Sequence, residues 1–101
     1  MATRIIRAQS EDGVRIGISG RFDFSTHREF RATYADDAPG SQPYIVDLSA
    51  TEYMDSSALG MLLLLRQHAG DDPSRVTLIG AGGVVRRVLE IANFGRLFRI
   101  P

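Results

Sequence analysis

Residues 53–66 read YMDSSALGMLLLLR, an apolar helix that begins directly after a cluster of small polar residues. On a wheel of about 3.6 residues per turn, its small and large apolar side chains form one compact stripe, which we assign to the core. The chain of 101 residues is long enough for one domain around such a core. The predicted core stripe consists of Ala58, Met61, Leu62, Leu65 and Ala69.

The polar cluster Asp55-Ser56-Ser57 contains three polar residues, although a helix N-terminus needs only one capping residue. Asp55 fits the N-cap position, where its carboxylate can accept a hydrogen bond from the amide of Ser57 or Ala58. Ser56 and Ser57 then occupy the first two helical positions, and we expect their hydroxyls to be free. Because a helix N-terminus stabilises an anion, a phosphate on such a hydroxyl would leave the fold intact and change only the surface charge.

The same helix contains more leucine than its core stripe uses. Leu59 and Leu63 lie one turn apart and fit contacts with a neighbouring helix. Leu64 lies outside the stripe, close to the line that runs from Ser57 through Gly60. We therefore expect Leu64 to be exposed and to contact a partner protein, with Gly60 allowing the partner to approach closely.

Strand and helix patterns alternate on both sides of this segment. The alternation predicts crossover connections between parallel strands, and Glu11-Asp12-Gly13 predicts a hairpin that makes the sheet mixed. The fold class is therefore α/β, with a mixed sheet of four to five strands flanked by α-helices. Strands are expected at residues 3–8, 14–19, 44–48 (buried on both faces), 75–79 and 97–100, and helices at residues 24–34, 56–69 and 83–93.

Three loops are expected to meet at the carboxyl edge of the parallel strands. They comprise residues 20–24, 49–55 and 80–83, so Asp23 should lie near the polar cluster. Ser25 or Thr26 can cap the helix that follows Asp23, and Thr26 with Glu29 fits a capping box. The third loop, GAGG, lacks both the G-x-G-x-x-G spacing and the lysine of a P-loop, which favours a tight turn over a nucleotide site.

Composition and charge exclude several classes of function. Twelve basic residues balance twelve acidic ones, which argues against a nucleic-acid-binding surface. The chain has no cysteine and no G-x-S-x-G motif, and His27 and His68 fit ordinary helix faces, so we expect no catalytic residue, metal or cofactor. No signal peptide is visible and the longest apolar run, residues 61–65, is too short for a membrane span, so a cytoplasmic protein is expected.

The motif YMDSSALG, which follows VDLS at residues 46–49, resembles the phosphorylation motif of the STAS domain in bacterial anti-anti-sigma factors, also called anti-sigma factor antagonists. The resemblance covers residues 1–101 as a single domain, because ISGRFDF matches the family's Gly-x-apolar-Asp loop and residues 83–100 resemble its closing helix and strand. It implies that Ser57 is the phosphoacceptor, with Ser56, Asp55 and Asp23 as neighbours. Helical geometry alone does not choose between Ser56 and Ser57.

Two departures from the family pattern concern the choice of partner. Phe22 and Phe24 make the loop around Asp23 more aromatic than usual, and Ala58 replaces the commoner glycine. We interpret both as features that tune partner binding, and we place Phe22 and Phe24 with Leu64 and Gly60 at the partner surface.

The function that the resemblance implies is partner switching. The unphosphorylated protein would bind an anti-sigma factor, often itself a serine protein kinase, or a similar regulator, and release what that regulator holds. Phosphorylation of Ser57 would weaken the complex, and a PP2C-type serine phosphatase would restore it. No nucleic acid or membrane is expected as a partner. The alternative is a STAS module that binds a small ligand or nucleotide without a phospho-switch.

Overall fold

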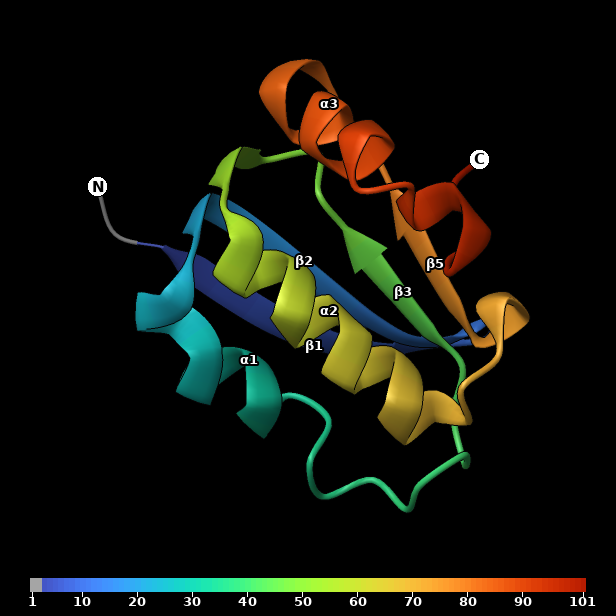
Figure 1. Ribbon diagram of the computed structural model, residues 1–101. Coiled ribbons are helices and arrows are strands. Elements are labelled where there is room, and N and C mark those ends of the chain that lie inside the picture. The colour runs from blue at the N-terminus through green and yellow to red at the C-terminus, as the bar shows by residue number, and fades with distance from the viewer. Residues whose placement is uncertain (1–2) are drawn as a thin grey trace.

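Within residues 3–101, which the computed structural model describes, strands and α-helices follow one another along the chain after an initial pair of strands (Figure 1), except that the strands at residues 44–47 and 51–54 have no helix between them. Three short 3-10 helices, at Phe24–Thr26, Pro73–Arg75 and Phe94–Arg96, complete the connections. The main elements are β1 (Arg4–Ser10), β2 (Gly13–Phe22), α1 (His27–Ala32), β3 (Tyr44–Asp47), β4 (Thr51–Met54), α2 (Ser56–Ala69), β5 (Val76–Ile79) and α3 (Gly83–Ile91).

The five strands form one mixed sheet, which confirms the predicted α/β class. Strands β2, β3 and β5 are parallel neighbours, and β1 pairs with β2 in the antiparallel direction. The β1–β2 hairpin closes through Glu11 and Asp12, as predicted. Gly13 follows at φ +126°, and a Cβ there would lie 2.3 Å from the carbonyl oxygen of Pro43, so only glycine fits this turn.

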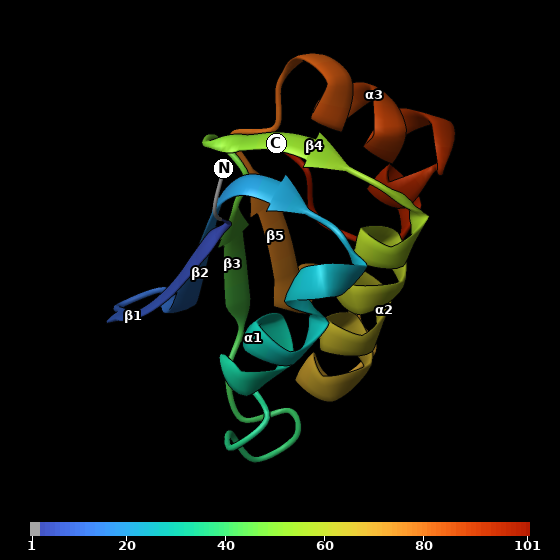
Figure 2. The same ribbon diagram turned by 90° about the vertical axis from the view of Figure 1, so that its left-hand side faces the viewer.

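One face of the sheet carries the core. Val14, Ile16 and Ile18 of β2 are buried, and Figure 2 shows α1 and α2 on the same side of the sheet. The prediction that residues 44–48 are buried on both faces is wrong, because Ile45 and Asp47 are only half-buried. Because side chains alternate along a strand, these two point to the opposite face of β3 from the buried Tyr44 and Val46.

Helix α2 buries the predicted core stripe. Its buried residues are the five that the helical wheel selected, from Ala58 at the first turn to Ala69 at the last. The helix ends at Gly70, whose φ of +119° is the left-handed conformation typical of a glycine C-cap. No helix within residues 3–101 is long and apolar enough to cross a bilayer.

The C-terminal segment departs from the prediction of a final strand. Asn93 adopts a left-handed conformation with φ +61°, and the 3-10 helix that follows turns the chain back. Phe98 then stacks on Phe94 in the core, with 5.0 Å between ring centroids. Residues 97–100 consequently make only one isolated parallel bridge, between Arg99 and Thr77 of β5.

Candidate functional site

The polar cluster lies at the carboxyl end of β4, a strand within the segment that we predicted to be a loop. β4 pairs in parallel with the last residues of β2, and this register places Met54 beside Phe22. Asp55 is the next residue after β4, and Asp23 is the next residue after β2. The two aspartates therefore leave neighbouring strand ends, which agrees with the predicted proximity of Asp23 to the cluster.

Asp55 caps α2 as predicted. Its backbone is extended (φ −116°, ψ −175°), and its carboxylate accepts a hydrogen bond from the amide of Ala58 at 3.0 Å. The Asp55 carbonyl accepts a second bond from the amide of Leu59 at 3.3 Å. Met54 before the cap is buried and Leu59 is half-buried, which is the arrangement of a hydrophobic staple.

Ser56 and Ser57 occupy the first two positions of α2, with Ser56 exposed and Ser57 half-buried. Among residues 3–101, neither hydroxyl has a hydrogen-bond partner. The backbone amides of Ser56 and Ser57 also have no partner in this part of the chain, since the cap satisfies the amides of Ala58 and Leu59 instead. The start of α2 thus offers two free hydroxyls and two free N–H donors.

Asp23 is the N-cap of the 3-10 helix at Phe24–Thr26. Its carboxylate accepts hydrogen bonds from the backbone amide of Ser25 at 3.1 Å and from the Ser25 hydroxyl. These bonds, chiefly that from the hydroxyl, lower the pKa of Asp23. The predicted Thr26–Glu29 capping box is wrong, because Thr26 makes no side-chain cap bond to α1 and its hydroxyl donates to the Asp23 carbonyl instead.

Sequence reasoning missed a pair of side chains beside Asp23. The guanidinium of Arg21 lies 4.0 Å from the centroid of the Tyr53 ring, and its Nε lies 3.4 Å from the Asp23 carboxylate. The parallel register of β2 and β4 pairs Arg21 with Tyr53 directly. No sequence pattern predicted this contact, because β4 itself was not predicted.

Of the four residues predicted to form the partner surface, three are exposed and Phe22 is buried. Leu64 is 54% exposed, which confirms its predicted exposure, and Gly60 has open space where a Cβ would stand. Phe24 is 64% exposed and stacks on His27. Phe22 cannot contact a partner: it is fully buried and packs against Phe30, with 5.1 Å between ring centroids. Strand alternation points Phe22 into the core and leaves Phe24, beyond the strand, free to face outward.

The glycine-rich turn at residues 80–83 contacts Ser49, which lies before β4, whereas the polar cluster follows β4. Gly80 has φ +75°, and a Cβ there would lie 2.8 Å from the Cβ of Ser49. This crowding supports the interpretation of a tight turn with close packing. Within residues 3–101 there is no group of acidic and histidine side chains that could hold a metal ion.

Comparison with known proteins places this geometry in a family. Residues 6–99 match the family described as "Mlab, STAS domain". A STAS-domain containing protein of Pseudomonas aeruginosa (strain UCBPP-PA14) is 48% identical over 93 residues, which cover 90% of this chain and 92% of the relative.

Solved structures with this fold include bacterial anti-sigma factor antagonists. The protein from Mycobacterium paratuberculosis has a TM-score of 0.80 at 20% identity, and the alignment covers 98% of this chain and 85% of that one. SpoIIAA in its unphosphorylated form has a TM-score of 0.71 at 20% identity, with 99% and 87% covered. The phosphorylated Bacillus SpoIIAA has a TM-score of 0.70 at 19% identity, with 99% and 91% covered. These similarities establish a shared fold.

Proposed function

The chain belongs to the STAS domain family, and we propose on this basis that it is a partner-switching regulator controlled by phosphorylation of Ser57. In its unphosphorylated form it binds an anti-sigma factor with serine kinase activity, or a similar regulator, and releases that regulator's target. A PP2C-type phosphatase removes the phosphate. The observation that carries the proposal is the free Ser57 hydroxyl at the start of α2, within the motif DSSALG.

The start of α2 can hold a phosphate without rearrangement. The unpartnered amides of Ser56 and Ser57 point toward the N-terminal side of the helix, where the dipole favours an anion. Because Asp55 already caps the amide of Ala58, a phosphate on Ser57 would add hydrogen bonds rather than replace one. This local chemistry supports modification of a folded domain.

Charge explains how the phosphate would release a partner. A phosphate adds about −1.5 to −2 units of charge at neutral pH. It would stand near two carboxylates, Asp55 and Asp23, and Arg21 is already engaged by Asp23 and Tyr53. The phosphate would then place strong negative charge beside the contact surface formed by Leu64, Gly60 and Phe24. This charge would weaken binding to a partner whose surface is acidic or apolar.

The test is phosphorylation by the cognate kinase followed by mass spectrometry. We expect one phosphate on Ser57, complete loss of labelling in Ser57→Ala, and labelling retained in the matched control Ser56→Ala. Circular dichroism should show that both variants are folded. Labelling confined to Ser56, or labelling that survives Ser57→Ala, would exclude Ser57 as the acceptor.

A further inference from the structure

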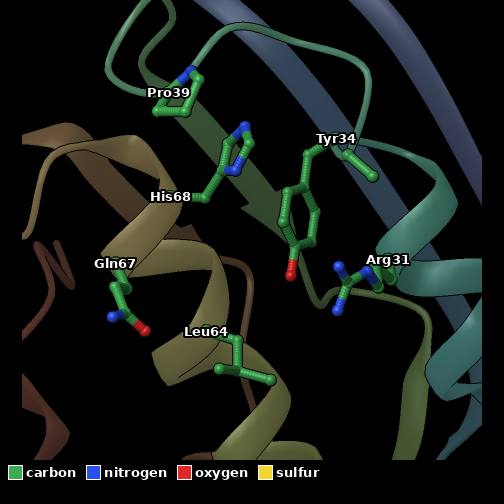
Figure 3. A pocket seen from close by; sticks show the side chains of 7 residues that line it. Arg31, Tyr34, Pro39, Leu64, Gln67 and His68 are labelled. Atoms are coloured by element: carbon green, nitrogen blue, oxygen red, sulfur yellow. The ribbon is translucent and has the colours of Figure 1, made fainter.

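A cavity of about 380 Å³ lies between α1 and α2, away from the glycine-rich turn. Arg31 and Tyr34 contribute from the side of α1, and Leu64, Gln67 and His68 contribute from α2 (Figure 3). Ala35 and Pro39 complete the lining. The cavity is a groove that is open to solvent, and its volume is comparable with the smaller ligand sites of proteins, which begin at about 300 Å³.

Tyr34 is a buried side chain whose polar end opens into this cavity. The residue is only 6% exposed, and its ring makes edge contacts with Phe30, Tyr44 and His68. Tyr44 donates its hydroxyl to Asp37 at 2.7 Å, but the Tyr34 hydroxyl has no hydrogen-bond partner within residues 3–101. Figure 3 shows this hydroxyl aimed into the cavity, between Arg31 and Leu64. Although most of the Tyr34 ring is buried, its hydroxyl oxygen is open to solvent from the cavity, because no side-chain oxygen or nitrogen in the described part of the chain is both buried and unpaired. The hydroxyl can therefore exchange water for a ligand that enters the cavity.

Arg31 supplies a positive charge at the same point. It is exposed and makes no ion pair in the described part of the chain. Its charge acts on Tyr34, where it opposes the effect of burial, and burial prevails and raises the pKa of the phenol. The Tyr34 hydroxyl therefore keeps its proton at neutral pH and can donate to an anion.

Two further polar side chains near the cavity, those of His68 and Asp37, make hydrogen bonds within the protein. His68 lies with Nε2 2.8 Å from the carbonyl oxygen of Asp37, so this nitrogen is not available to a ligand. The Asp37 carboxylate accepts from Arg7 at 2.8 Å and from Tyr44, so it does not neutralise Arg31. The remaining donors at the cavity are thus the guanidinium of Arg31, the hydroxyl of Tyr34 and the exposed amide of Gln67.

We propose that the cavity between α1 and α2 binds a small organic carboxylate with an apolar body. The carboxylate accepts hydrogen bonds from the Arg31 guanidinium and the Tyr34 hydroxyl, a charge-assisted arrangement. The apolar body packs on Leu64 and Pro39, which border the same cavity. Its two donors, Arg31 and Tyr34, lie outside the proposed phosphorylation site, whereas Leu64 is shared with the proposed partner surface.

The experiment titrates the ¹⁵N-labelled full chain with hexanoate at neutral pH and follows amide chemical shifts. We expect saturable shifts centred on residues 31–39 and 64–68. Hexanol, which lacks the charge, and acetate, which lacks the apolar body, should each bind at least about tenfold more weakly. Shifts that never saturate, or hexanol binding as tightly as hexanoate, would overturn the proposal.

Two single substitutions test the assigned donors. Tyr34→Phe removes only the unpaired hydroxyl, so it should keep the melting temperature and weaken hexanoate binding about fivefold. Arg31→Gln should weaken it about tenfold or more. Arg87→Gln, which removes one exposed arginine from α3, is the matched control and should bind like the wild type. Unchanged affinity in both Tyr34→Phe and Arg31→Gln would show that the site is assigned wrongly.

Discussion

The N-termini of α2 and α3 differ in their capping residues and in the side chains of their first turns, although each helix follows a strand of the same sheet. Asp55 caps α2 with its side chain, and two serines with free hydroxyls follow it. At α3 the cap position is Gly82, which offers no side-chain bond, and Val84 in the first turn is 63% exposed. Both ends carry a helix dipole, but of the two only α2 presents free serine hydroxyls beside it. The two helix starts share the same backbone dipole. The side chains of the first turn therefore decide which of them is a candidate switch.

The two helices agree in how they divide their apolar side chains. Leu62 of α2 and Leu89 of α3 are buried, whereas Leu64 and Val84 are exposed. In both helices the buried residues lie on one stripe. An apolar residue off that stripe stays exposed to solvent and contributes little to the core.

The largest effect is expected from a substitution that opens the core face of α2. Leu62→Ala should lower the free energy of unfolding by about 2–5 kcal/mol, because it leaves a cavity at a fully buried site. The matched control Leu64→Ala should cost less than about 0.5 kcal/mol, since that side chain is mostly in solvent. Urea denaturation measures both. Equal losses in the two variants would contradict the assignment of Leu64 to the surface.

The N-cap of α2 should give the next largest effect. Asp55→Ala removes the acceptor of the Ala58 amide and should destabilise the protein by about 0.5–2 kcal/mol. Asp55→Asn keeps a capping oxygen and serves as the control, with most of the stability retained. Thermal unfolding would decide the question: equal melting temperatures of Asp55→Ala and wild type would mean that the cap contributes nothing.

Added charge at Ser57 should affect binding more than folding. Ser57→Asp is expected to keep the free energy of unfolding within about 1 kcal/mol, because a carboxylate suits the first turn of a helix. Its affinity for the partner regulator should nevertheless fall below that of the wild type, which calorimetry or a pull-down with the purified partner can measure. A large drop in melting temperature would show that Ser57 is needed by the fold itself.

The smallest effect is expected from adding a cap to α3. Gly82 has extended backbone (φ −136°, ψ 168°) and open space where a Cβ would stand, so Gly82→Asp can adopt the native conformation. The new carboxylate should raise the free energy of unfolding by a few tenths of a kcal/mol, about the difference between glycine and aspartate as N-caps. Gly82→Ala is the control without a capping oxygen. A loss of stability in Gly82→Asp would indicate that the turn before α3 has a packing role at Gly82 as well as at Gly80.

Local pattern alone determined much of this protein. The five-residue core stripe of α2, the Asp55 cap and the β1–β2 hairpin were predicted correctly. Each depends on interactions within a few residues, such as a helical period or a cap bond three residues along the chain. The STAS resemblance was also readable from the sequence, because its motif is short and contiguous.

Only the tertiary structure decided the rest. β4 exists because residues 51–54 pair with the end of β2, about thirty residues earlier, and no local pattern marks that pairing. The same pairing places Arg21 on Tyr53 and buries Phe22 while Phe24 remains outside. The cavity beside Tyr34 likewise forms only when α1 and α2 pack together, and the same packing determines where the Tyr34 hydroxyl points. Periodicity determines which face of an element is apolar, but contacts between distant segments determine which groups meet and which remain unpaired.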